Sequence, residues 1–295
     1  MNRKKILKIT ALIVALVLLG GLAWFANGMI GNPISRHLAT KTATKHLEAN
    51  YSDTTYKIDE VIYSFKDGHY YARVSSPDSI DGDFSIEINM LGKLIDDHYD
   101  TYVADGTNTA RRLDMDYRQL VDSVFQSDTF PYVSEIDYGT LEFIPQSYFT
   151  DEKIHNEVKD LHDIPWYGII YEDLIIDGVY DVRELGKKAG HIILYVDTDD
   201  VTVDNACEVL LNVKEMLDNA GIGFYCIDLV LEYPRTSDEH PVRKEGRVEV
   251  ESFLYTDIYE DGLFDRVSEA NEKIAAWHAE QDKLYKDFIP ENTEE

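Results

Sequence analysis

The sequence predicts an α+β protein: one membrane-spanning helix, then a helix with a four-stranded antiparallel sheet, then a second domain that is an α/β sandwich. Three observations support this fold class. An uncharged apolar run covers residues 9–30, alternating apolar positions mark strands up to residue 102, and helical and strand patterns follow each other from residue 130 onward. This order of elements is typical of layered domains with separate cores.

The composition excludes several classes of protein and of partner. The chain has 295 residues, 44% of them hydrophobic, and 56 Asp and Glu against 28 Lys and Arg give a formal net charge of −28. A disordered, collagen-like or disulfide-scaffold chain is excluded. An acidic surface repels phosphate backbones, so we expect no nucleic-acid partner. The usual nucleophile, zinc-protease, phosphate-loop and dinucleotide motifs are absent, so the sequence predicts no cofactor and no catalytic residue.

The apolar run predicts a transmembrane helix over 9–30, preceded by a short cytoplasmic tail over 1–8. As a helix the run extends about 33 Å, enough for a hydrocarbon core of about 30 Å. Trp24 and Phe25 suit the far interface. A cleaved signal peptide, with Gly21-Leu22-Ala23 as the cleavage site, stays open as an alternative. A lipoprotein is excluded because the only cysteines are Cys207 and Cys226.

The charges beside this run predict its orientation. Arg3, Lys4, Lys5 and Lys8 precede it without any acid, so the tail is expected in the cytoplasm and the rest of the chain outside. This predicts a single-pass protein of the cell membrane with an acidic ectodomain. The opposite orientation stays open, because Arg36, Lys41 and Lys45 follow the run.

Residues 32–104 are predicted to form a small α+β domain. Asn32-Pro33 suits the start of a helix, and one half of the helical wheel over 34–49 is more apolar than the other. Strands alternate on both sides of Lys66-Asp67-Gly68, which indicates a hairpin. Two further strands are predicted over 84–89 and 94–102.

Residues 105–129 are predicted to be a connecting helix, and residues 130–289 a C-terminal α/β sandwich domain that ends in a frayed tail over 290–295. The clearest part has the order β-α-β-β-α, which suits a ferredoxin-like arrangement. The predicted elements are strand 138–144, helix 151–161, strand 168–176, helix 181–190, strand 191–196, helix 203–220, strands 222–233 and 247–256, and helix 264–288.

The best polar constellation follows the strand over 191–196. The candidate ligands are oxygens that suit Ca²⁺, and they are Asp197, Asp199, Asp200 and Glu208. The loop departs from the EF-hand pattern, because Val201 and Thr202 occupy its fifth and sixth positions. The alternative interpretation, which we favour, is a strand-to-helix loop in which Thr202 or Asn205 caps the next helix.

Other polar groups carry weaker signals. His155 and His162 could share a helix face as metal ligands, but solvated residues are the favoured interpretation. In Asp96-Asp97-His98, strand alternation sends Asp97 to one face and its two neighbours to the other. The loop over 234–245 begins a basic island with Arg243, Lys244 and Arg247, which could contact a partner.

The two cysteines are expected to stay apart. Cys207 belongs to a helical pattern, and Cys226 alternates with Asp228 on the less apolar face of a strand. Two free thiols are favoured over a disulfide, which stays open because the sequence does not give the distance between them.

Four short segments carry a resemblance to a known family: Gly31-Asn-Pro-Ile-Ser35, Tyr63-Ser-Phe-Lys-Asp-Gly-His-Tyr70, Val74-Ser-Ser-Pro-Asp-Ser79 and Arg183-Glu-Leu-Gly-Lys-Lys-Ala-Gly-His-Ile-Ile-Leu-Tyr195. The chain resembles the YfjL-like family of uncharacterised single-span membrane proteins of Gram-positive bacteria. The resemblance implies an exported ectodomain and supplies no active site. The helix with four strands also looks like a PepSY or cystatin-type unit, which says nothing of function.

These observations lead to two functional hypotheses. The first is a membrane-anchored, extracytoplasmic binding or regulatory module of the cell envelope, with a possible protein partner there. The alternative is an envelope hydrolase whose carboxylate or metal site forms only in three dimensions.

Overall fold

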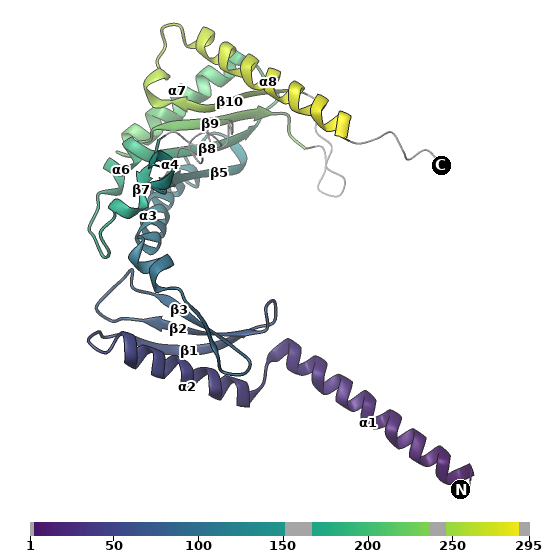
Figure 1. Ribbon diagram of the computed structural model, residues 1–295. Helices are drawn as coiled ribbons and strands as arrows, with labels where there is room; N and C mark the ends of the chain where they lie inside the picture. The colour runs from purple at the N-terminus through teal and green to yellow at the C-terminus, as the bar shows by residue number, and fades with distance from the viewer. Residues whose placement is uncertain (1–2, 151–166, 236–245, 289–295) are drawn as a thin grey trace. The chain divides into compact units, whose positions relative to one another are not determined.

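The computed structural model describes residues 3–150, 167–235 and 246–288, which form two compact units (Figure 1). Unit 1 contains residues 1–109 and 174–178, and unit 2 contains residues 110–173 and 179–295. The predictions for helix 151–161, for the tail over 290–295, for His155 and His162, and for Arg243 and Lys244 lie outside the described residues.

Unit 1 begins with two helices, α1 (Arg3–Ile30) and α2 (Pro33–Asn50). A four-stranded antiparallel sheet follows in the order β1-β2-β3-β4. Its strands are β1 (Lys57–Ser64), β2 (His69–Ser75), β3 (Phe84–Asn89) and β4 (Leu94–Asp97). The helix with four strands and the predicted hairpin are therefore confirmed. The last strand is shorter than expected, because the chain turns after Asp97 into a π-helical turn over Asp100–Ala104.

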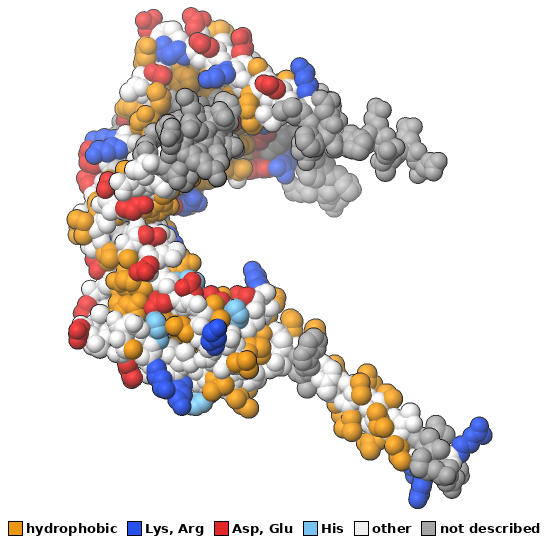
Figure 2. Space-filling model, viewed as in Figure 1, with side chains coloured by type: hydrophobic (Ala, Val, Ile, Leu, Met, Phe, Trp, Pro, Cys, Tyr) orange, Lys and Arg blue, Asp and Glu red, His pale blue; other side chains and the backbone are white. Residues whose placement is uncertain are grey.

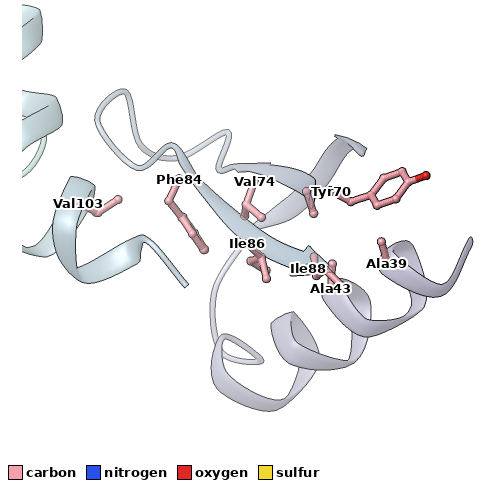
Figure 3. Close-up of a cluster of buried hydrophobic side chains, with 9 residues drawn as sticks. Ala39, Ala43, Tyr70, Val74, Phe84, Ile86, Ile88 and Val103 are labelled. Carbon is pink, nitrogen blue, oxygen red and sulfur yellow. The ribbon is translucent and has the colours of Figure 1, made fainter. Parts of the chain in front are cut away.

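The core of unit 1 lies between α2 and one face of this sheet. Ala39 and Ala43 of α2 are fully buried against the inward residues of β2 and β3 (Figure 3). Figure 3 places Tyr70 at one end of this core and Val103 at the other. Small residues on α2 let the helix approach the sheet closely. For this reason the buried face of α2 contains few large apolar residues.

A short segment from later in the chain completes unit 1. Asp177 accepts hydrogen bonds from Ser79 and from the backbone N–H groups of Ile80 and Asp81 at 2.8–2.9 Å. Its own N–H donates to Asp81 at 3.0 Å. Asp177 holds a left-handed φ of 59°, which this clamp compensates. The prediction of one domain over 130–289 therefore differs from the structure at residues 174–178.

Unit 2 contains a four-stranded sheet in the order β10-β9-β8-β5. Its strands are β5 (Val133–Leu141), β8 (Gly190–Asp197), β9 (Cys226–Glu232) and β10 (Arg247–Leu254). β8 and β9 are parallel and pair directly, and the outer pairs are antiparallel. A split βαβ unit would place another strand between β8 and β9, so the ferredoxin-like comparison is not confirmed.

The helices of unit 2 are α3 (Thr107–Phe125), α4 (Ser147–Thr150), α6 (Val182–Ala189), α7 (Val203–Asn219) and α8 (Leu263–Phe288). Strands β6 (Phe143–Ile144) and β7 (Ile169–Ile170) form a parallel pair with a 3₁₀ turn over Tyr171–Asp173 after it. A second 3₁₀ turn covers Tyr255–Asp257. The predicted strand over 168–176 is therefore much shorter in the structure, and the strand predicted from Ile222 begins only at Cys226.

α3 is more than a connector. Its Tyr117 is fully buried and donates a hydrogen bond to the carbonyl of Gly223 at 2.9 Å. Three glycines make room for this ring, and a Cβ on Gly139, Gly186 or Gly190 would lie 2.4–3.0 Å from Tyr117 atoms. Most of α3 thus belongs to the helix layer on one face of the unit 2 sheet.

Candidate functional site

The end of α1 is fixed to unit 1 by a small set of neutral polar groups, which we call the junction: Gly28, Gly31, Asn32, Tyr63 and Tyr70. The Tyr63 hydroxyl donates to the carbonyl of Gly28 at 3.0 Å. The Tyr70 hydroxyl accepts from the Asn32 N–H at 2.8 Å and donates to the Asn32 carbonyl at 3.0 Å. Two of these bonds satisfy groups that the helix ends leave without an intrahelical partner, the Gly28 carbonyl and the Asn32 N–H. The Asn32 carbonyl also accepts the first bond of α2, from the Arg36 N–H at 3.0 Å.

Gly31 lets the chain turn sharply from α1 into α2. It has a left-handed φ of 69°, and a Cβ there would lie 2.5 Å from the Tyr70 hydroxyl oxygen and 2.9 Å from Tyr63 Cγ. Only glycine combines that backbone angle with so little room. Asn32 then caps α2 by accepting from the Ser35 N–H at 2.8 Å, and Pro33 occupies the first turn as predicted.

α1 itself is the one described helix long and apolar enough to cross a membrane, and none of its apolar window is buried inside the protein. Length and composition alone fit both a membrane span and a signal sequence. The side chains of Leu12, Leu16, Leu19 and Leu22 are all exposed. In water this would be a large apolar surface, which a soluble unit does not normally expose.

The two faces of the unit 1 sheet carry separate histidine clusters. On the α2 side, Asp97 accepts from the Tyr51 hydroxyl at 2.9 Å and lies 2.5 Å from His46 Nε2. On the other face, Glu87 contacts His69 Nδ1 and lies 3.4 Å from His98 Nε2. The predicted alternation of Asp97 with its neighbours is therefore confirmed.

A shallow groove of about 540 Å³ lies on the flank of unit 1 between α2 and the edge strand β1. Arg36, Thr40 and Thr44 line it from the helix, and residues 58–62 line it from the strand. A bulge between Ile58 and Glu60 interrupts the pairing of β1. Both polar and apolar side chains line this groove, and none of its polar residues is buried.

Unit 2 places five titratable side chains close together, and we call them the His191 cluster: Glu142, Tyr167, His191, Cys226 and Asp228. His191 and Cys226 are paired neighbours on the parallel strands β8 and β9, and Asp228 lies two residues further along β9. The strand pairing therefore carries Cys226 and Asp228 to the same face of the sheet as His191.

His191 lies between two carboxylates. Its Nδ1 is 3.0 Å from Glu142 Oε1 and its Nε2 is 3.0 Å from Asp228 Oδ1. The second contact is an ion pair outside hydrogen-bonding geometry. Burial lowers the pKa of His191, but Asp228 and Glu142 outweigh it and raise that pKa to about 9. The imidazole is therefore charged at neutral pH.

A bulge in β10 gives Asp228 a further donor. The pairing shifts between Val250 and Phe253, and Ser252 has a left-handed φ of 48°. This turns the Ser252 N–H toward Asp228 Oδ1 at a distance of 2.6 Å. The bulge thus aims a backbone N–H group at the Asp228 carboxylate.

The thiol of Cys226 is held in its neutral form. Its Sγ lies 2.7 Å from the Tyr167 hydroxyl, whose ring stacks on Tyr225 at 4.3 Å. Burial raises the pKa of Cys226 to about 12, and Asp228 and Glu142 act in the same direction. Burial also raises the pKa of the Tyr167 hydroxyl. A reactive cysteine needs a lowered pKa, so burial works against nucleophilic reactivity of this thiol at neutral pH.

The family is shown by two matches that together cover most of the chain. Residues 4–101 match the YfjL-like N-terminal domain and residues 116–268 match the YfjL-like C-terminal domain. The chain belongs to the YfjL-like family. Together, the two domains of this YfjL-like protein include most of α1, the junction and the whole His191 cluster.

Other comparisons add little to this family assignment. The YfjL-like chain is similar to a DUF5037 family protein from Ruminococcus gnavus of known crystal structure, with 12% identity, 78% of this chain and 98% of that chain covered, and a TM-score of 0.20. No curated protein matches.

The candidate calcium ligands lie around the start of α7 in the YfjL-like structure, and one of them, Asp200, takes part in its cap. Thr202 caps α7 by accepting from the Asn205 N–H, and its hydroxyl donates to Asp200 at 2.9 Å. Asp197 ends β8, Asp199 is exposed, and Glu208 lies on α7. In the described residues, no three His, Cys, Asp or Glu side chains gather so as to hold a metal ion. The capping interpretation is confirmed.

Both cysteines are free thiols, as favoured from the sequence, but Cys207 is only half-buried. The His191 cluster itself was missed. One signal could have indicated it, because Asp228 interrupts an otherwise apolar strand and a charge there requires a partner. Glu142 and Tyr167 gave no such signal, because loop residues reach His191 only through the tertiary fold.

Proposed function

We propose that this YfjL-like protein is a single-span membrane protein of the bacterial envelope, with α1 as an uncleaved anchor and both units outside the cytoplasm. In this proposal the units act by binding, as an interaction or regulatory module. The likeness of unit 1 to PepSY or cystatin-type units remains part of the proposal as a comparison of shape only.

The length and exposure of α1 carry the anchor. Its uncharged apolar run over 9–30 is longer than the apolar region of about 7–15 residues that is typical of a signal peptide. None of its apolar window is buried inside the protein, so these side chains have no protein surface to pack on. The junction adds a defined exit, because Tyr63 bonds to Gly28 of α1 and Tyr70 bonds to Asn32 just after it. Together these features support a retained helix.

The protonation of the His191 cluster argues against a cysteine hydrolase in unit 2. A cysteine hydrolase needs a thiolate and a histidine that can accept a proton. The raised pKa values of Cys226 and His191 give the opposite protonation states at neutral pH. We therefore assign this cluster to the stability of unit 2.

The anchor is tested by expressing the full chain and a variant that lacks residues 1–30 in a bacterial host. We expect the full chain in the membrane pellet after alkaline extraction, with an intact N-terminus by mass spectrometry, and the variant in the supernatant. A full chain in the supernatant, or a product cleaved near Gly21-Leu22-Ala23, would contradict the anchor.

The binding role needs a separate experiment. Proximity labelling from a fusion at the C-terminus should enrich the same envelope protein repeatedly, and co-purification should then recover it. The matched control joins α1 to an unrelated soluble domain. Equal enrichment by both fusions would count against a binding module.

A further inference from the structure

Two turns of the unit 1 sheet lie at the same end as the junction. His69 pairs with Asn89, so the β1–β2 turn over 65–68 and the β3–β4 turn over 90–93 are neighbours. The first turn follows Tyr63 directly, and a Cβ on Gly92 of the second would lie 2.9 Å from Leu38 of α2. Both turns and the start of α2 therefore surround the point where α1 ends.

Each of these segments exposes a large apolar side chain. Leu91 is 85% exposed, Ile34 is 75% exposed and Phe65 is 60% exposed. Figure 2 shows hydrophobic side chains gathered where α1 meets unit 1. Hydrogen bonds within the β3–β4 turn fix the backbone on both sides of it. Asn89 Oδ1 accepts from the N–H groups of Leu91 and Lys93 at 2.9 and 3.0 Å.

Charge is distributed unevenly between the two ends of unit 1. At the junction end, Arg36, Lys66 and Lys93 are exposed. The acid beside them, Asp67, accepts from the His69 N–H and the Tyr71 hydroxyl. Toward the opposite end the exposed cations are Lys45, Lys57 and Arg73, and Arg73 is paired with Glu60 at 2.8 Å. The exposed acids there include Asp53, Asp78, Asp83 and Asp100.

We infer that the junction end of unit 1 docks on the surface of the bilayer that α1 crosses, with the apolar tips in the interface and the cations on anionic lipid headgroups. The tips form the membrane-facing rim, defined as Ile34, Phe65 and Leu91. This inference rests on the proposed anchor, because α1 fixes which end of unit 1 meets the membrane. Apolar insertion and cation attraction are the two contributions that hold proteins at anionic interfaces.

Docking of the rim also gives the junction bonds a purpose. A flexible linker would let unit 1 leave the membrane, whereas the bonds from Tyr63 and Tyr70 keep both turns at the depth where α1 ends. Tyrosine is itself suited to this depth, since its ring is apolar and its hydroxyl polar.

The test uses the full chain in lipid nanodiscs that contain anionic phosphatidylglycerol and lipids brominated on the acyl chains. Phe65→Trp and Leu91→Trp place reporters in the rim, and Ile80→Trp is the control at the opposite end, where Ile80 is 69% exposed. The wild-type protein gives the emission of the native tryptophans, which serves as the baseline for the added reporters. We expect blue-shifted, strongly quenched added emission from both rim variants and neither change from the control.

The failures can be told apart. Protein that does not co-elute with the discs contradicts the anchor. Protein that co-elutes but has rim reporters as unquenched as the Ile80→Trp control contradicts docking and leaves the anchor standing.

Charge is tested by adding Arg36→Gln, Lys66→Gln and Lys93→Gln to the Leu91→Trp variant. Each substitution should lower the ratio of docked to undocked unit 1 about fivefold in anionic discs, because that is the contribution of one cation to binding near an anionic surface. Lys57→Gln at the far end should leave the quenching unchanged. Equal quenching in all of these variants would contradict the role of the cations.

Discussion

The junction of unit 1 and the His191 cluster of unit 2 both satisfy polar groups that are withdrawn from water, but with different chemistry. The junction uses neutral hydroxyl, amide and carbonyl groups, and Tyr70 is 1% exposed there. The His191 cluster uses formal charges, with one imidazolium between two carboxylates. Neutral bonds tolerate a low dielectric, whereas a buried charge is stable only with its partners present.

This difference predicts that substitutions in the two regions destabilise the protein by different amounts and with a different dependence on pH. Removing one group of the His191 cluster leaves an uncompensated charge, so the loss should be large and depend on pH. Removing one group of the junction leaves a neutral donor or acceptor, so the loss should be small and independent of pH.

The largest effect is expected for His191→Gln. The two carboxylates would lose their cation, and we expect the free energy of unfolding of unit 2 to fall by about 3–5 kcal/mol. His278→Gln is the matched control, because His278 is more exposed and its partner Glu249 keeps Arg247. Hydrogen exchange in β8 and β9 measures both changes. Equal losses in the two variants would contradict a special role for buried charge.

The second prediction concerns pH. The pKa of His191 is about 9 in the folded protein against 6.5 for an ordinary histidine. The stabilisation that goes with this raised pKa is complete at a pH below the ordinary pKa of histidine, and it is lost as the pH rises through the pKa of His191 in the folded protein. The free energy of unfolding of unit 2 should therefore fall by up to about 3 kcal/mol between these two pH values. Denaturant unfolding of wild type and His191→Gln at several pH values measures this. The same slope in both proteins would assign the effect to other groups.

An intermediate effect is expected for Gly31→Ala. The left-handed φ and the 2.5 Å approach to the Tyr70 hydroxyl should together cost about 1–3 kcal/mol at the junction. Gly28→Ala is the control, since nothing lies within 4 Å of its added Cβ. Protease cleavage between α1 and α2 reports the loosening, and a Gly31→Ala junction as resistant as that of wild type would show that the turn is not constrained.

The smallest effect is expected for Tyr70→Phe. The ring stays buried, but both Asn32 backbone groups lose a partner, which should cost about 1 kcal/mol. Tyr71→Phe on the opposite face removes only a bond to Asp67 near the surface. Exchange of the Asn32 amide should rise in the first variant alone, at any pH between about 6 and 9.

The two regions also differ in how well sequence predicts them. Each strand of unit 1 pairs with the next strand along the chain, so the turn at Gly68 and the helix start at Pro33 could be located from local patterns. The His191 cluster depends on pairing between β8 and β9 and on the loop residue Tyr167, which local patterns do not specify. Asp97 shows an intermediate case, since its face was predicted but the end of its strand was not.

The central claim is that α1 stays in the bilayer and carries both units outside. A membrane-impermeant maleimide tests it on intact cells that express full-length Asp53→Cys or Lys5→Cys protein, with wild type as the control for Cys207 and Cys226. We expect label on the Asp53→Cys protein before lysis and on the Lys5→Cys protein only after lysis. Label on Lys5→Cys in intact cells, or on neither variant until lysis, would contradict the claim.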